Sequence, residues 1–196
     1  MVRIMKKNSK INRTYKKMEG IEMLSIQDIT SCLRDDTKKV AMQPCYVSTA
    51  HKNYSIQDKL YDVALDFWEK CGFDVSFVDK ITKESVLMLI SDKNVMDGLS
   101  KDLKKHDEFA VNAMLDFINI FSFIMTLSAQ EICEFNSASA RQKQVLFAVF
   151  LLTLAFHYQY MRNEFMERLK QAPVVFGGKD FAYRSKLLHD MLLKIS

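Results

Sequence analysis

A twelve-residue run, VLFAVFLLTLAF (Val145–Phe156), constrains the fold more than any other part of this sequence. It contains one hydroxyl group, that of Thr153, and no charge. A helix that is apolar on every side needs apolar neighbours all round it, either lipid or protein. The first question is therefore whether this run crosses a membrane or forms the middle of a core.

The length of the run and its flanks favour a core. A membrane-spanning helix needs about 20 apolar residues to cross roughly 30 Å of hydrocarbon. At 1.5 Å per residue the run covers only about 18 Å. Lys143 lies just before it, and His157 and Arg162 follow. We interpret the run as part of a buried central helix over about residues 140–171, which we expect Pro173 to end.

The scarcity of turn-forming residues points to helices throughout. The chain has 196 residues with 5 Gly and 2 Pro, whereas average usage would give roughly 14 Gly and 10 Pro. Such a chain has few sites for the tight reversals of a sandwich or barrel. The sequence therefore predicts an all-α fold, a single bundle of about six or seven helices around the central helix.

A second long apolar segment, FAVNAMLDFINIFSFIMTL, precedes the central helix. We expect one helix from Ser100 to about Ser128, because polar side chains recur along one side of it at helical spacing. This polar stripe belongs in water and argues against a lipid-facing helix. It consists of Lys101, Lys104, Lys105, Glu108, Asn112, Asp116, Asn119, Ser122, Thr126 and Gln130.

Shorter signals mark the other helices. Capping-box spacings predict helix starts at Ser128, with Glu131, and at Ser139, with Gln142. Gly72 is typical of a helix end. The remaining predictions are helices over 21–35, 55–71, 82–91 and 180–195, an extended connector over 73–78 and a turn at 97–98.

Charge divides the chain into an arm and a body. The net charge of the chain is +4. Residues 1–17 contain seven basic residues and no acid and so carry +7, which leaves 4 − 7 = −3 for the rest of the chain. We expect residues 1–18 to be a disordered arm and residues 19–196 a single helical domain with a long loop at about 36–54. The arm is a candidate contact for an acidic membrane surface or nucleic acid. Its basic residues are Arg3, Lys6, Lys7, Lys10, Arg13, Lys16 and Lys17.

The arm and the cysteines suggest a cytoplasmic location. No apolar stretch follows the arm, because Glu19, Gly20, Glu22 and Asp28 interrupt it, so it does not resemble a secretory signal. The four cysteines, at 32, 45, 71 and 133, contain no CxxC pair, so a zinc site is not expected. Buried thiols in a reducing compartment are the simplest interpretation.

No motif predicts a catalytic, cofactor or metal site. Gly177-Gly178-Lys179 lacks the rest of a phosphate-binding loop, and Asp180 would repel an anion at the following helix start. His51, His106, His157 and His189 share no metal-ligand spacing. His157 is predicted to be a partly buried, hydrogen-bonded histidine, and a ligand or proton-transfer role is the alternative.

The leading hypothesis is therefore a non-enzymatic interaction protein: an adaptor, secretion chaperone, inhibitor or subunit of a larger assembly. Its partner would be another protein or a second copy, and no small-molecule substrate is inferred. One alternative is a membrane-active bundle that exposes the apolar hairpin 109–127 and 145–160 on a trigger. The other is a nucleic-acid-associated regulator that acts through the basic arm.

Overall fold

The computed structural model describes residues 55–175 and 179–195. These residues contain eight helices and no strand, so the predicted all-α fold is confirmed. The predicted arm, the predicted helix 21–35 and the predicted loop 36–54 lie outside the described residues. The helices are α4 (Ser55–Lys70), α5 (Lys80–Ser91), α6 (Lys93–Lys104), α7 (Glu108–Thr126), α8 (Ala129–Asn136), α9 (Ala140–Tyr160), α10 (Arg162–Val175) and α11 (Lys179–Leu193).

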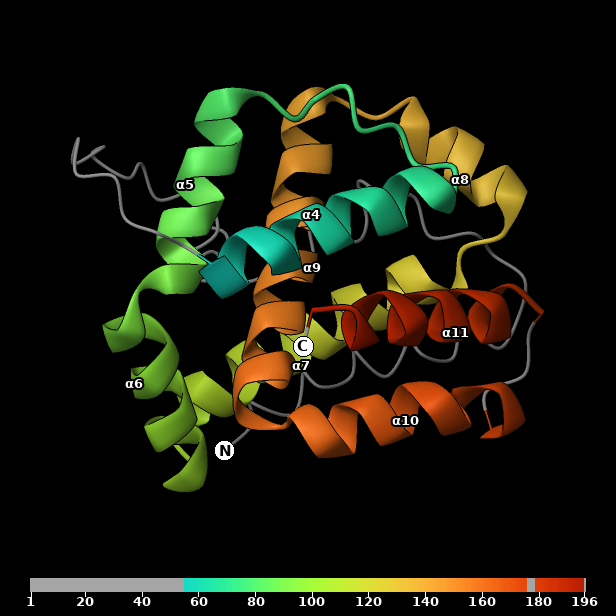
Figure 1. Ribbon diagram of the computed structural model, residues 1–196. Coiled ribbons are helices and arrows are strands. Elements are labelled where there is room, and N and C mark those ends of the chain that lie inside the picture. The colour runs from blue at the N-terminus through green and yellow to red at the C-terminus, as the bar shows by residue number, and fades with distance from the viewer. Residues whose placement is uncertain (1–54, 176–178, 196) are drawn as a thin grey trace, which may run out of the picture.

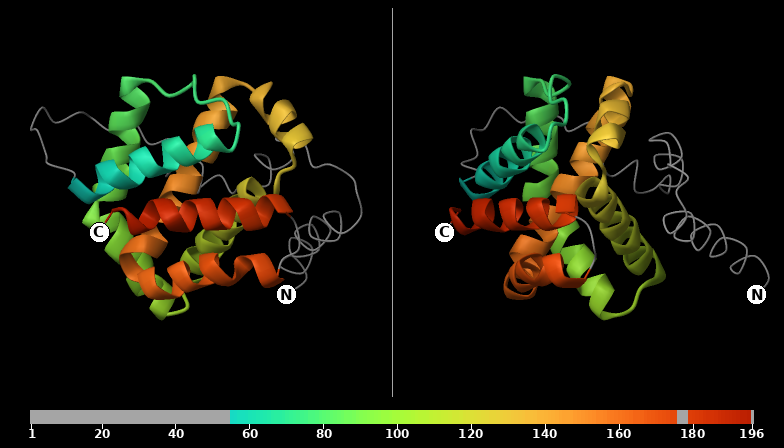
Figure 2. Two further views of the ribbon diagram at one scale, coloured as in Figure 1. Left: turned by 45° about the vertical axis from the view of Figure 1, so that its right-hand side comes forward. Right: turned by 90° about the vertical axis from the view of Figure 1, so that its right-hand side faces the viewer.

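Helix α9 is the central element, as predicted. It runs through the middle of the bundle and packs against α4, α5, α7 and α10 (Figure 1). Helices α4 and α11 cross one side of α9, and α7 lies on the other side (Figure 2). Every residue from Leu146 to Phe156 is at most 2% exposed. Protein, and not solvent, therefore surrounds the run on all sides.

Aromatic side chains fill the space around α9. The Trp68 ring of α4 is fully buried and lies edge-on to Phe147, with the two ring centroids 5.1 Å apart. The Phe150 ring stacks on Phe67 of α4 at 5.6 Å and on Phe121 of α7 at 5.4 Å. Aromatic pairs of this geometry add to the gain from burial itself. They tie α4 and α7 to opposite sides of the central helix.

The prediction of one continuous helix over 140–171 is wrong. Helix α9 ends at Tyr160, and α10 leaves it at an angle of 116°. A straight helix of that length would extend about 48 Å, beyond the bundle. The bend at Met161 instead lets Phe165 and Leu169 pack into the core, where they are 6% and 4% exposed. Nor does Pro173 end α10, which continues to Val175.

The prediction of one helix from Ser100 to Ser128 is also wrong. The chain breaks at His106, whose φ of 56° lies in the left-handed region, and α7 begins two residues later. The predicted turn at Asp97-Gly98 lies inside α6. The polar stripe is therefore divided among α6, α7 and α8, and Asp116 within it is only 6% exposed. The water-facing stripe is not present as predicted.

Several predicted helix ends are confirmed. Ser128 with Glu131 and Ser139 with Gln142 form complete capping boxes at the starts of α8 and α9. Gly72 follows α4 with a φ of 89°, and Phe73 N–H bonds back to the Trp68 carbonyl oxygen at 3.0 Å. This is the bond pattern of a glycine-ended helix. Residues 73–78 form a connector without a strand, as expected.

Candidate functional site

Two aspartates and one left-handed residue shape the corner between α6 and α7. The Asp92 carboxylate accepts a hydrogen bond from Asn94 N–H at 2.8 Å and caps α6. The Asp107 carboxylate accepts one from Ala110 N–H at 3.1 Å and caps α7. Between the two helices, His106 reverses the chain through its positive φ. The corner therefore brings α6 and α7 together within three residues.

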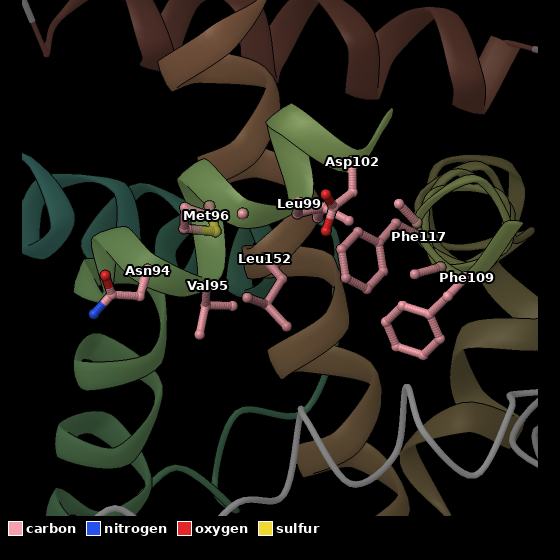
Figure 3. Close-up of a pocket in the computed structure, with 11 residues that line it drawn as sticks. Asn94, Val95, Met96, Leu99, Asp102, Phe109, Phe117 and Leu152 are labelled. Atoms are coloured by element: carbon pink, nitrogen blue, oxygen red, sulfur yellow. The ribbon is translucent and has the colours of Figure 1, made fainter. Parts of the chain in front are cut away.

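A groove of about 240 Å³ opens between α6 and α7, with Leu152 of α9 between them (Figure 3). Met96 and Leu152 are 2% and 1% exposed, whereas Phe109 is 55% exposed. The groove thus has a buried floor and an exposed aromatic ring at its edge. Its principal lining side chains are Val95, Met96, Leu99, Phe109, Phe117 and Leu152, with Asn94 and Asp102 as the polar ones.

The chemistry of the groove suits apolar contact. Its lining includes no Cys, His, Ser or Lys, so it offers no nucleophile with a neighbouring base. Asp102 is the one charged lining residue, and its carboxylate lies 3.9 Å from the Lys105 ammonium. The volume is below the 300–1,000 Å³ of most small-molecule pockets. The groove is of a size to take one or two apolar side chains.

A polar junction joins the end of α4, α8 and α9. The Asn136 side chain accepts a hydrogen bond from Asp74 N–H at 2.7 Å and donates one to the Gly72 carbonyl oxygen at 2.9 Å. The Lys143 ammonium donates to the Asp74 carboxylate and, at 3.2 Å, to the Asn136 carbonyl oxygen. The hydrogen bond from Lys143 to the Asp74 carboxylate, with those from Ser76, lowers the pKa of Asp74 to about 2. The junction is occupied by its own partners and is structural.

Arg184 of α11 is a buried cation. It is 4% exposed and donates hydrogen bonds to the carbonyl oxygens of Ile124 and Met125, at 3.3 and 3.2 Å. These carbonyls belong to the last turn of α7, where a cation is favoured by the helix dipole.

Burial raises the pKa of the Cys71 thiol to about 11, although Arg184 partly lowers it. Cys71 is therefore protonated at neutral pH and a poor nucleophile.

His157 is half-buried at the end of the apolar run. Its Nδ1 lies 2.8 Å from the Thr153 carbonyl oxygen, and burial lowers its pKa. The ring lies 5.1 Å from that of Phe165. The prediction of a partly buried, hydrogen-bonded histidine is confirmed. Among the described residues, no group of three or more His, Cys, Asp or Glu side chains could hold a metal ion.

The predicted anionic-surface contact cannot be placed. Its seven basic residues, Arg3 to Lys17, lie outside the described residues, and the same is true of Gly177 and Gly178. Contact with nucleic acid or a membrane surface through the arm therefore stays a prediction.

Helix α7 is the one described helix that is by itself long and apolar enough to cross a membrane. Its mean hydropathy over 18 residues is 1.6, but only 44% of this stretch is buried. Helices α9 and α10 would add a second span only if the pair, bent by 116°, acted as one. The apolar helix with the most uncovered surface is thus α7.

No known protein family, curated protein or solved structure shows significant similarity to this chain. The interpretation of the α6–α7 groove therefore depends on its own geometry and chemistry.

Proposed function

We propose that this protein is an interaction protein that binds an apolar anchor side chain of another protein in the groove between α6 and α7. The observation that carries the proposal is the combination of a buried apolar floor with an exposed aromatic edge. Leu152 and Met96 form the floor, and Phe109 is 55% exposed beside it. Binding hot spots are of this kind: a large side chain of one partner fills an apolar pocket of the other.

The size and charge of the groove support a peptide or helix as its ligand. A cavity of about 240 Å³ holds an anchor side chain but not a typical cofactor. At the groove, Asp102 and the exposed Lys105 that lies 3.9 Å from it offer charges of both signs, which suits the polar edge of a protein interface. The partner expected here is an amphipathic helix with one protruding Leu, Met or aromatic side chain.

The test compares two exposed aromatic residues by affinity purification of the full chain from its native cells. Phe109→Ser removes the groove edge, and Tyr183→Ser removes a ring that is 58% exposed on α11, away from the groove. We expect specific partners to be retained by Tyr183→Ser and reduced at least about tenfold by Phe109→Ser, equivalent to about 1.4 kcal/mol. Equal recovery with both variants would contradict the proposal.

A second candidate function, membrane activity, is favoured by α7 alone. This helix has 19 residues, and more than half of its most apolar 18-residue stretch is not buried in the core. Dye release from anionic vesicles, measured from pH 7 to pH 4, tests it. Complete retention of dye at every pH would remove this candidate.

A further inference from the structure

The outward face of α7 carries a row of three apolar side chains that ends in a serine. Leu115 and Ile118 are 46% and 40% exposed, and Val111 and Ser122 are half-buried. These four positions follow one another at intervals of four, three and four residues. That spacing is the seam of two helices packed side by side. The row lies on the side of α7 away from Ala113 and Phe117, which line the α6–α7 groove.

The row suits a single helix better than a whole protein surface. From Val111 to Ser122 it extends about 17 Å along the helix, which is short for an interface of about 800 Å² per partner. The only charged residue within this stretch is Asp116, and it is buried on another side of α7. The occupant therefore needs a short apolar row and no charge opposite Leu115 and Ile118.

We propose that the chain's own segment 19–35 covers this face. The sequence of that segment has helical period, and residues 22, 26, 29 and 33 repeat the same intervals of four, three and four. Three of these four are apolar: Ile26, Ile29 and Leu33. In an antiparallel pairing Ile29 meets Leu115, Ile26 meets Ile118, and the one polar position, Glu22, meets Ser122. The segment lies outside the described residues, and its sequence is the basis for the match.

The connection is long enough for this contact. Residues 36–54 separate the segment from the start of α4 and can span up to about 60 Å when extended. A domain of roughly 140 residues has a radius of gyration of only about 14 Å. Attachment to the same chain gives the segment an effective concentration in the millimolar range. The row on α7 is too short for a stable contact between separate molecules, but at this effective concentration it is sufficient to bind a segment of the same chain.

Cys32 allows a direct test in the full chain. Antiparallel pairing places it opposite position 112, so Asn112→Cys should form a disulfide with Cys32 within one molecule under mild oxidation. Parallel pairing would favour Ser122→Cys instead. Cys45 and Cys133 are changed to Ser in all variants, and Tyr183→Cys, at a position of α11 that is 58% exposed, is the matched control. Peptide mapping of the monomer and dimer bands identifies each disulfide.

A disulfide within the monomer between Cys32 and the thiol introduced at position 112 or 122 supports the proposal, provided that it forms at least tenfold faster than the disulfide of the Tyr183→Cys control. A disulfide between two chains through the engineered positions would instead assign the face to a second copy. No preference over the α11 control would also overturn the proposal. The α6–α7 groove plays no part in this experiment, so its outcome and that of the partner-binding test are independent.

Discussion

Replacing Asp74 by Asn should destabilise the bundle because it leaves a buried cation without its carboxylate. The Lys143 side chain is only 7% exposed, and that of Asp74 is 31% exposed. The Asp74 pKa of about 2, against 3.8 for an ordinary Asp, corresponds to about 2.4 kcal/mol at 1.36 kcal/mol per pKa unit. Partial exposure of Asp74 reduces this to on the order of 1–2 kcal/mol. The uncompensated Lys143 raises the expected cost of Asp74→Asn to about 2–3 kcal/mol at pH 7.

The pH dependence gives a second signature of the same contact. A carboxyl group whose pKa is lowered by folding stabilises the protein above its unfolded pKa, and this contribution disappears as pH falls toward the folded value. The advantage of the wild type over Asp74→Asn should therefore be full at pH 6–7. About half of the contribution that depends on Asp74 ionisation should be lost by pH 3. Urea unfolding followed by far-UV circular dichroism at both pH values measures the difference.

An exposed pair on the same part of the fold supplies the control. Lys70 and Asp66 are 2.6 Å apart on α4, with side chains 50% and 46% exposed. Asp66→Asn should cost no more than about 0.5 kcal/mol, because exposed pairs contribute little. If Asp74→Asn costs no more than Asp66→Asn, or if its effect is unchanged at pH 3, the junction does not stabilise the fold through this ion pair.

Three further predictions concern the backbone, Arg184 and the thiols. Gly72→Ala should destabilise the fold by about 1 kcal/mol because the φ of Gly72 is positive. Gly98→Ala should stabilise it by about 0.5–1 kcal/mol, because Gly98 lies inside α6 and an added Cβ meets nothing within 4 Å. Thermal melts that show equal effects for the two variants would contradict this. Arg184→Leu should cost about 1–3 kcal/mol, because it strands two carbonyl oxygens of α7; an unchanged urea midpoint would refute it. Exposed Cys133 should react with iodoacetamide at pH 7.5 much faster than half-buried Cys71, whose pKa is about 11. Equal labelling of the two thiols, measured by peptide mapping, would contradict the raised pKa of Cys71.

The features that sequence reasoning predicted correctly are those encoded locally. The run Val145–Phe156 is apolar on every side, and a helix of this kind has to be central in any helical bundle. Capping boxes at Ser128 and Ser139 are fixed by side chains three residues apart, so short-range spacing is enough to identify them. The glycine at 72 ends α4 for an equally local reason.

The errors arose where tertiary packing competes with helical periodicity. Periodicity alone allows one helix from Ser100 to Ser128, and the left-handed conformation of His106 that breaks it has no strong sequence signal. The candidate groove was missed for the same reason, because a turn predicted at Asp97-Gly98 removes one of its walls. Asp92 before an apolar spacing of 95, 96, 99 and 103 was the signal that could have identified α6.

Helix α7, and not α9, is the helix expected to contact a membrane first. The Leu and Phe side chains from Leu146 to Phe156 are essentially fully buried, and at about 1.5–3 kcal/mol each their burial is comparable with the whole stability of a domain. Exposing α9 therefore amounts to unfolding, whereas Leu115 and Ile118 of α7 are 46% and 40% exposed on the described bundle, so release of segment 19–35 from this face would be enough to bring them to lipid. Any vesicle leakage should accordingly fall several-fold in Leu115→Lys and stay unchanged in Leu193→Lys, a leucine 51% exposed on α11. Leakage that is equal in the two variants would show that α7 is not the first helix to reach the lipid.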